Sequence, residues 1–257
     1  MIIENEDGGR GTGFLVFRPI LLGSEDEGNI FLVTNKHILG KTGLKRYIAK
    51  YVRIHYNIMV QEKIKKDYAD LSLCDSNSSK IWREHPDKNV DVLAIEITHL
   101  FDAVPEIYNW TINYYNGIAD KSIRSKLRIT IGDDVFVIGY PLGLTGSLSN
   151  FPIARAGIIA SRIGHEVIWG AKKLRAFFVD SAIFPGSSGS PVILKPTSSD
   201  MIYNNSEELP SSILLGIISQ VKLGPIKWKE DILPNYAHLG LAYDAETIKE
   251  TIDLFYQ

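Results

Sequence analysis

The chain has 257 residues, 45% of them hydrophobic and 23% charged, with a formal net charge of −2 at pH 7. This length and composition are ordinary for a globular protein and allow one large domain or two small ones that share an interface. The weak net charge gives no reason to expect nucleic acid or an anionic membrane as a partner.

Two features of the sequence bear on where the protein works. The amino-terminal residues are acidic and lack the basic-then-apolar pattern of a secretory signal, and no apolar run is long enough to span a membrane. Cys74 is the single cysteine, so an intrachain disulfide is impossible, which indicates a reducing compartment. We therefore expect a cytoplasmic protein without a membrane partner.

Short apolar runs separated by Gly, Pro and Asn turns predict strands along most of the chain. An array of many short strands is typical of an all-β sandwich or barrel. The predicted strands cover residues 13–18, 30–34, 51–59, 90–98, 134–139, 153–162, 175–180, 191–195 and 213–220.

Two segments depart from this strand pattern. Residues 106–126 hold few strand signals and are expected to link two halves of the chain. Near the end, apolar residues recur at helical spacing behind Asp244, a residue type that favours the N-cap of a helix. We therefore predict a terminal amphipathic helix within residues 243–257, packed on the second half.

A glycine-bracketed turn lies between two of the predicted strands. Gly186 and Gly189 flank Ser187 and Ser188, and Pro191 ends the turn. Because glycine has no Cβ, this backbone can turn sharply enough to aim amide groups at one point, as the oxyanion of acyl transfer requires. Taken alone, such a stretch is more often a plain turn, because Gly, Ser and Pro are common loop residues.

A serine nucleophile also needs a base and an acid that orients the base. His37 follows an apolar run at a polar break, which places it at a rim where a general base can reach substrate. Asp91 heads an apolar strand and is costly to bury without a partner such as a histidine N–H. Asp70 is a rival acid, and we prefer Asp91 because its predicted strand is longer and more apolar.

In this order along the chain, His37, Asp91 and Ser188 resemble the site of the trypsin-like serine peptidases, most closely the HtrA-type and related bacterial branch. The resemblance covers nearly the whole chain. The motifs that carry it are Gly11-Thr12-Gly13-Phe14, Thr34-Asn35-Lys36-His37, Asp91-Val92-Leu93-Ala94-Ile95, Ile138-Gly139-Tyr140-Pro141-Leu142-Gly143 and the stretch from Asp180 to Pro191.

The resemblance implies an all-β fold of two antiparallel β-barrels with the active site between them, followed by a C-terminal helix. The first barrel would span residues 1–105, with a long insertion at about 40–89, and the second residues 127–242. No stretch resembling a PDZ module follows the barrels, so we do not extend the PDZ-dependent regulation of HtrA-type enzymes to this chain.

The resemblance also implies the parts of the site. His37, Asp91 and Ser188 would form the catalytic triad, and the amides of Gly186, Ser187 and Ser188 the oxyanion hole. Residues 215–221 resemble the strand whose edge pairs with the substrate backbone. The residues expected to bind substrate are Ala182, Ile183, Phe184, Ser219, Gln220 and Val221.

The implied pocket favours small or medium aliphatic residues before the scissile bond. Ala182 stands where relatives that cut after Arg or Lys have an acid, so a buried substrate cation would be unpaired. Val221 stands where wide-pocket relatives have glycine, and Ile183 makes the lining apolar.

Two positions near Ser188 depart from the family pattern. Ser187 replaces the aspartate of digestive members, so we expect no activation by amino-terminal cleavage, because a new ammonium would have no partner there. Ser190 replaces a glycine.

The sequence therefore predicts a serine endopeptidase that acts on polypeptides. Two alternatives remain: a catalytically silent binding module of the same fold, and a protease dedicated to one partner within a larger assembly. The histidines show none of the close spacing that metal sites use, so we expect no metal, and no cofactor is implied.

Overall fold

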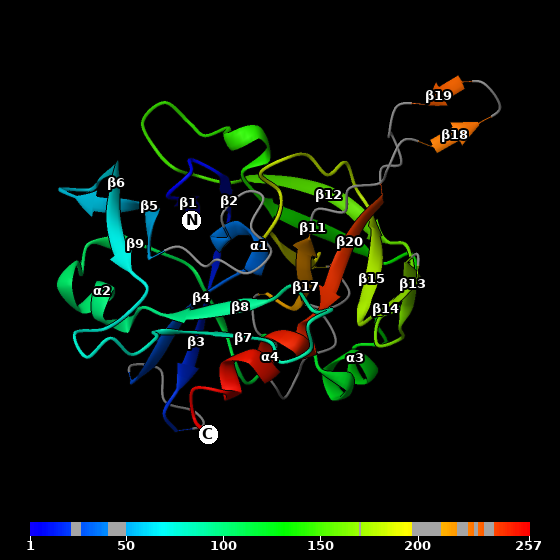
Figure 1. Ribbon diagram of the computed structural model, residues 1–257, viewed down its shortest axis with the longest axis horizontal. Coiled ribbons are helices and arrows are strands. Elements are labelled where there is room, and N and C mark those ends of the chain that lie inside the picture. The colour runs from blue at the N-terminus through cyan, green and yellow to red at the C-terminus, as the bar shows by residue number, and fades with distance from the viewer. Residues whose placement is uncertain are drawn as a thin grey trace.

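The computed structural model describes residues 1–21, 27–40, 50–169, 171–196, 212–219, 226–228, 231–233 and 239–257. The described part of the chain is built mostly from strands, which form two groups in chain order (Figure 1). The all-β fold with a C-terminal helix is thus confirmed.

The described strands of the first half, together with β9 and β10 from the link, form two five-stranded sheets rather than one closed barrel. Their facing apolar side chains, among them Leu32 and Ile95 from one sheet and Ile54 from the other, share one buried core. One sheet has the order β2-β1-β5-β6, with β9 also paired to β5, and the other has the order β10-β3-β4-β8-β7. Their bounds are Ile2–Asn5 (β1), Arg10–Thr12 (β2), Phe14–Pro19 (β3), Gly28–Thr34 (β4), Tyr51–Val60 (β5), Lys63–Ser72 (β6), Trp82–Glu84 (β7), Leu93–Glu96 (β8), Ile107–Tyr108 (β9) and Thr111–Asn113 (β10).

The second half contains a closed barrel of six strands in the order β11-β12-β15-β20-β17-β16. Its interior is filled by β-branched and aromatic side chains such as Val137, Phe177 and Ile218, which suit a pleated buried surface. The barrel strands are Asp134–Gly139 (β11), Ile153–Ile159 (β12), Ala176–Asp180 (β15), Pro191–Leu194 (β16), Leu214–Ser219 (β17) and Leu239–Asp244 (β20). Two further pairs join Val167–Trp169 (β13) to Lys172–Leu174 (β14) and Ile226–Trp228 (β18) to Asp231–Leu233 (β19).

The helices are short. They are Lys36–Leu39 (α1), Thr98–Ala103 (α2), Lys121–Lys126 (α3), the 3-10 turn Pro141–Gly143 (η1) and Ala245–Asp253 (α4). Within the described residues, none is long and apolar enough to cross a lipid bilayer. The segment 106–126, expected to link the halves, contains β9, β10 and α3, and β10 pairs in parallel with β3.

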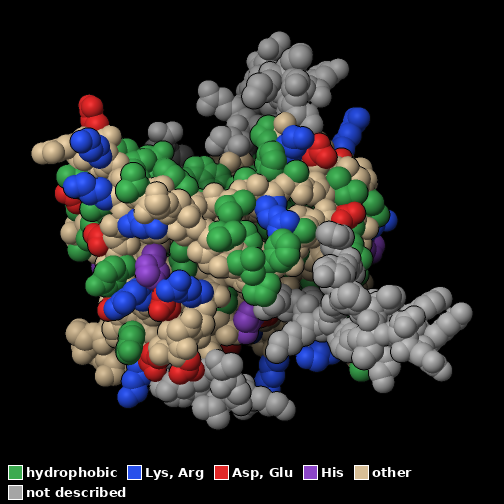
Figure 2. Space-filling model, turned by 90° about the horizontal axis from the view of Figure 1, so that it is seen from above, with side chains coloured by type: hydrophobic (Ala, Val, Ile, Leu, Met, Phe, Trp, Pro, Cys, Tyr) green, Lys and Arg blue, Asp and Glu red, His purple; other side chains and the backbone are tan. Residues whose placement is uncertain are grey.

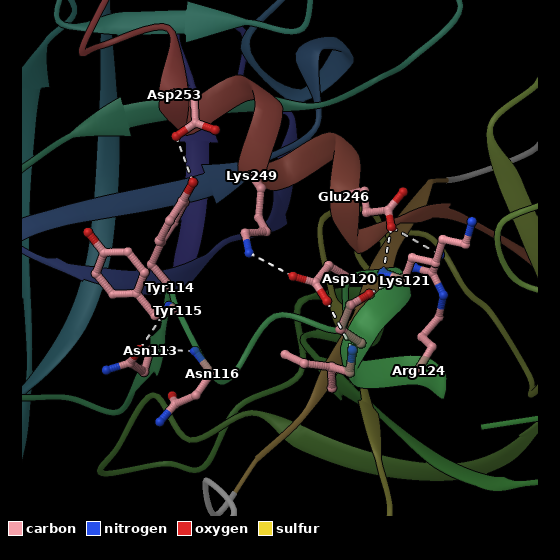
Figure 3. Close-up of polar contacts among 12 residues, drawn as sticks. Asn113, Tyr114, Tyr115, Asn116, Asp120, Lys121, Arg124, Glu246, Lys249 and Asp253 are labelled. Atoms are coloured by element: carbon pink, nitrogen blue, oxygen red, sulfur yellow. Dashed lines mark hydrogen bonds and ion pairs between the residues drawn. The ribbon is translucent and has the colours of Figure 1, made fainter. Parts of the chain in front are cut away.

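Helix α4 returns from the barrel to the first half. Its N-cap is Asp244, whose carboxylate accepts the Glu246 N–H, as the sequence predicted. The helix packs not only on β17 and β20 of the barrel but also on β7 and β8 of the first half. Figure 3 shows its polar contacts with the link: the Lys249 ammonium lies 3.1 Å from the Asp120 carboxylate, and the Tyr114 hydroxyl donates to Asp253 at 2.6 Å. Because one helix touches both halves and the link, it holds them in a fixed relation.

Candidate active site

His37 lies in α1, directly after β4, and contacts Asp91 through two groups. Its ring nitrogen Nδ1 is 2.5 Å from Asp91 Oδ2, and its backbone N–H donates to Asp91 Oδ1 at 3.2 Å. The His37 side chain is 44% exposed, so its free face reaches solvent. With Nδ1 facing a carboxylate, the proton of a neutral ring stays on Nδ1 and leaves Nε2 as a proton acceptor. The pair is therefore arranged as a general base with its orienting acid.

Asp91 is itself held by two side chains from different parts of the chain. The Ser219 hydroxyl donates to Asp91 Oδ2 at 2.9 Å, and the Asn35 amide donates to the Asp91 backbone carbonyl at 2.7 Å. Ser219 is the last residue of β17, so its hydrogen bond crosses from the barrel to the first half. Neither supporting role was predicted from the sequence, where Ser219 was expected to form a wall of the substrate pocket.

The rival acid, Asp70, lies away from His37. It sits in β6, where its carboxylate forms two hydrogen bonds with the Arg53 guanidinium at 2.7 and 2.9 Å. The length argument that favoured Asp91 was wrong, because β6 has ten residues, whereas β8 has four and begins after Asp91. The structure nevertheless brings Asp91, and not Asp70, to the histidine.

The loop that leads to Asp91 is fastened to α4 by a buried histidine. His85 Nε2 lies 2.8 Å from Glu250 Oε2, and its Nδ1 accepts the Asp87 N–H at 3.1 Å. Glu250 also binds the Arg175 guanidinium at 2.7 and 2.8 Å. These hydrogen bonds, first those from Arg175 and then that from His85, hold the pKa of the Glu250 carboxyl below its usual value. Lys36 adds a hydrogen bond to the His85 carbonyl at 2.7 Å.

Ser188 lies in a turn that is joined by backbone hydrogen bonds to both halves. Its carbonyl accepts the Thr12 N–H at 2.8 Å, and the next amide, that of Gly189, donates to the Ile218 carbonyl at 2.8 Å. Gly189 has φ +83°, and a Cβ there would lie 1.9 Å from the Thr12 carbonyl oxygen. Only glycine fits this position. Because Ile218 precedes Ser219, these bonds bring the Ser188 turn beside the residue that holds Asp91.

Gly186 also adopts a conformation that favours glycine, with φ +90°. The carbonyl before it, that of Pro185, accepts the Leu142 N–H at 2.6 Å. The Ser187 amide donates to the Phe184 carbonyl at 2.9 Å. The expected oxyanion hole included the Ser187 amide, and this expectation is corrected here. The Ser187 N–H is already bonded within the turn and does not serve as a third donor. Gly186 and Ser188 remain the candidate donors.

The residues expected to bind substrate are only partly described. Ile183 packs on Gly240, where a Cβ would lie 2.6 Å from Ile183 Cγ1. Phe184 is partly exposed, and the Arg155 guanidinium lies 4.7 Å from its ring centroid. Ala182 lies next to Ile183 in the same partly buried segment. Gln220 and Val221 lie outside the described residues.

The strand expected to pair with substrate along residues 215–221 is a central strand in its described part. β17 pairs with β16 on one edge and with β20 on the other. Its hydrogen bonds within the barrel therefore leave little edge for β-augmentation before residue 220.

Exposed apolar side chains lie in η1 and in the loop after it, and η1 contacts the Ser188 turn through the hydrogen bond from Leu142 to Pro185. Leu142 in η1 and Leu144, Leu148 and Phe151 in the loop after it are all exposed. This loop lies at the top of Figure 1, and Figure 2 shows apolar side chains gathered on the face seen from that side.

Two buried polar atoms lack a hydrogen-bond partner within the described part of the chain: Asn35 Oδ1 and Ser190 Oγ. Ser190 stands at the position where the resembling family has glycine, and its hydroxyl fills the space beside Gly139, where a Cβ would lie 1.9 Å away. A glycine on β11 thus accommodates the extra hydroxyl. Among the residues described, no group of three or more His, Cys, Asp or Glu side chains is placed to hold a metal ion.

Three solved structures that match this chain are distant from it in sequence. The active form of the Rv3671c protease from M. tuberculosis is 16% identical, with a TM-score of 0.48 over 98% of this chain and 77% of that chain. The HtrA-type protease AlgW, with a tripeptide, is 13% identical, with a TM-score of 0.47 over 95% and 60%. The protease domain of MamO from Magnetospirillum magneticum is 12% identical, with a TM-score of 0.45 over 91% and 92%.

No curated protein sequence matches the chain. A family model does match, over residues 11–197, and it describes the trypsin-like peptidase domain. This match covers more than half of the chain and includes the His37–Asp91 pair and the Ser188 turn. The chain therefore belongs to the trypsin-like peptidase family.

Proposed function

We propose that this peptidase is a serine endopeptidase that uses Ser188, His37 and Asp91. The observation that carries the proposal is the contact of His37 Nδ1 with Asp91, supported by Ser219 from the strand beside the Ser188 turn. Ser188 Oγ attacks the carbonyl carbon of the scissile peptide while His37 Nε2 takes the hydroxyl proton. The carbon–nitrogen bond then breaks, and His37 returns the proton to the leaving amine. Water, activated by the same ring, hydrolyses the acyl-enzyme and restores Ser188.

The Gly186 and Ser188 amides would stabilise the oxyanion that forms in each half of the reaction. The hydrogen bond from Leu142 turns the Pro185 carbonyl toward η1. In a trans peptide the N–H points opposite to the carbonyl, so the Gly186 N–H faces away from η1. A single donor of this kind is worth about 3–4 kcal/mol of transition-state stabilisation.

Activation by a newly cut amino terminus is not part of this proposal. Ser187 carries no charge that could pair with an ammonium, and its hydroxyl accepts the Phe184 N–H at 3.3 Å within the turn. The turn is instead ordered by its hydrogen bonds to Thr12, Leu142 and Ile218. The intact mass of the active enzyme checks this, because obligatory removal of residues before Gly11 would contradict it.

Small or medium aliphatic side chains are the proposed residues before the scissile bond. The segment of Ala182 and Ile183 offers no acid to a substrate cation, and Ile183 occupies the space over Gly240. Ile183→Ala should therefore make Phe and Tyr more acceptable before the scissile bond. The kcat/KM for such peptides should rise by about 10-fold relative to peptides with small aliphatic residues, since pocket methylenes are worth about 1–3 kcal/mol. A peptide-library profile dominated by Arg, Lys or Glu before the cut would contradict this preference.

The function is tested by turnover of the same peptide library with the wild-type chain and with Ser188→Ala. Wild type should cleave, and the variant should lose about 10⁴-fold or more, because the triad acts as a unit. Ser188→Ala should melt at nearly the wild-type temperature. Equal cleavage by both chains would reject the proposed nucleophile, whereas a folded wild type that cleaves no library peptide would reject a general endopeptidase.

A further inference from the structure

Thr12 makes four hydrogen bonds that meet behind the Ser188 turn. Its N–H donates to the Ser188 carbonyl at 2.8 Å, and its hydroxyl donates to the Gly186 carbonyl at 2.8 Å. The same hydroxyl accepts the Tyr140 N–H at 3.1 Å, and the Thr12 carbonyl accepts the Thr34 hydroxyl at 2.8 Å. The side chain is almost completely buried. One residue of the first half is thus bonded to the turn on both sides of Ser187.

The hydroxyl of Thr12 completes a clamp on Gly186. The peptide before Gly186 is held by the hydrogen bond from Leu142 to the Pro185 carbonyl, and the peptide after it by the bond from Thr12 to the Gly186 carbonyl. Because peptide groups are planar, a residue whose two flanking peptides are fixed has no free backbone dihedral. These two bonds together therefore restrain the backbone of Gly186 and, with it, the direction of the Gly186 N–H.

Glycine needs such a clamp more than any other residue. With no Cβ, Gly186 can reach many backbone conformations, and a rotation of the peptide before it would turn its N–H away from the oxyanion. At φ +90° a Cβ would lie 2.4 Å from the Tyr140 carbonyl oxygen, so this position cannot be stiffened by a side chain. The restraint has to come from outside the turn.

The surroundings of Thr12 leave room for this hydroxyl. Gly139 lies beside it, and a Cβ there would be 2.8 Å from Thr12 Oγ1. The hydroxyl uses its proton for Gly186 and one lone pair for Tyr140, so each of these contacts depends on it. A valine of the same shape would keep the packing and lose both bonds.

We propose that the Thr12 hydroxyl is a positioning group for the oxyanion donor Gly186, so that it accelerates the chemical step without touching substrate. This role rests on the proposed function, because it assumes that the Gly186 N–H binds an oxyanion. A residue of the first half would thus help to order the oxyanion hole. It would do so in a chain where Ser187 replaces the charged aspartate of digestive members.

The test compares three variants of the full chain at Thr12. Thr12→Ser keeps the hydroxyl, Thr12→Cys replaces it with a weak donor of similar size, and Thr12→Val removes it. Thr251→Val is the matched control, because Thr251 is also a buried threonine whose hydroxyl binds a backbone carbonyl, at 2.7 Å in α4. It shows how far loss of a buried hydroxyl affects turnover through stability alone.

We expect kcat to fall by about 10- to 100-fold in Thr12→Val, less than the 10²- to 10³-fold typical of deleting an oxyanion donor. Thr12→Ser and Thr251→Val should stay within about threefold of wild type, with Thr12→Cys in between. KM and the shape of the pH profile should not change, since His37 and the substrate pocket are untouched. A peptide aldehyde, which forms an oxyanion adduct with serine, should bind more weakly in parallel with kcat, and the matching peptide alcohol should bind as before.

Full kcat in a folded Thr12→Val chain would overturn this role, as would a loss that Thr12→Ser does not restore or one that appears in KM and alcohol binding. If Thr12→Val does not fold, equal turnover of Thr12→Cys and Thr12→Ser overturns it. A wild-type chain that neither cleaves peptides nor binds the aldehyde more tightly than the alcohol refutes the proposed function and this role together. Wild-type cleavage with unchanged variants refutes this role alone.

Discussion

The two halves of the molecule hold their shares of the candidate site in different ways. In the first half, His37 and Asp91 are positioned by side chains, because Asp91 binds His37, Ser219 and Asn35 through its carboxylate and carbonyl. In the second half, the Ser188 turn is positioned by glycine conformations and by backbone hydrogen bonds, together with the hydrogen bond from the Thr12 hydroxyl to the Gly186 carbonyl. A polar side chain can be removed one contact at a time, whereas a glycine at positive φ against another backbone cannot be replaced without moving the chain. Substitutions of the polar side chains around Asp91 should therefore lower activity by graded amounts. Substitution of a glycine in the Ser188 turn should instead disturb the whole turn.

The largest effect is expected from neutralising the acid of the first half. Asp91→Asn should lower kcat by about 10⁴-fold, because an amide at this position favours the wrong tautomer of His37. Asp70→Asn is the matched control, since Asp70 binds Arg53 and not the histidine. Steady-state kinetics of the two variants decide between the acids, and the opposite result would mean that the His37–Asp91 contact has no catalytic role.

A smaller loss, and a larger change in stability, is expected in the second half from Gly189→Ala. The new Cβ would lie 1.9 Å from the Thr12 carbonyl, so the turn must shift, and turnover should fall by at least about 100-fold, as when an oxyanion donor is lost. Gly132→Ala is the control, because Gly132 has φ +94° but nothing within 4 Å of its Cβ position. It should cost only about 1–2 kcal/mol of unfolding free energy and leave turnover unchanged. Similar kinetics for both variants would show that backbone contact does not hold the Ser188 turn.

The hydrogen bond that joins the halves should matter less than either of these. Ser219→Ala removes one donor from Asp91 and should lower kcat by about 10-fold, the equivalent of a hydrogen bond to a charged group worth about 1.5 kcal/mol. Ser161→Ala removes a hydroxyl that accepts the Phe178 N–H at 2.7 Å and should leave kcat unchanged. If Ser161→Ala lowers kcat as much as Ser219→Ala, loss of stability and not the contact with Asp91 explains the effect.

The smallest expected effect concerns α4 and is seen in stability. Glu250→Gln weakens the contacts with Arg175 and His85 that lower the pKa of Glu250 below its usual 4.5. A carboxyl with a lowered folded pKa stabilises the fold above its unfolded pKa and loses this contribution as the pH falls through the folded value. The unfolding free energy of wild type should therefore exceed that of Glu250→Gln by at most about 1 kcal/mol at pH 7, because the carboxylate is partly exposed. This difference in unfolding free energy should shrink below pH 4.5. Urea unfolding at several pH values measures it, and a difference that grows on acidification would contradict the assignment.

Much of the fold followed from local patterns in the sequence. The apolar runs that became β3, β4, β5, β11, β15 and β16 agree with the predicted strands to within about two residues. Strands of two to four residues such as β2, β7 and β9 were missed, because their pairing depends on distant partners and leaves little periodicity. The arrangement of the first half as two sheets depends on such partners and was not predicted.

Some residues of the candidate site could likewise be predicted from local motifs, whereas others depend on partners that are distant in the sequence. His37, Asp91 and Ser188 were found from motifs, but the reason for choosing Asp91 over Asp70 was wrong, since strand length says nothing about which carboxylate faces the histidine. The roles of Ser219, Asn35 and Thr12 come from hydrogen bonds between residues far apart in the sequence. The motif Gly11-Thr12-Gly13-Phe14, for example, marks Thr12 without revealing its hydrogen-bond partners.

The most direct test of the account is labelling with a fluorophosphonate probe followed by peptide mapping, because this probe reacts with a serine hydroxyl only where a base activates it. The wild-type chain should give one modified peptide, the one that contains Ser188, with no labelling in Ser188→Ala and strongly slowed labelling in His37→Ala. Labelling at another residue, or a folded wild-type chain that stays unlabelled, would contradict it.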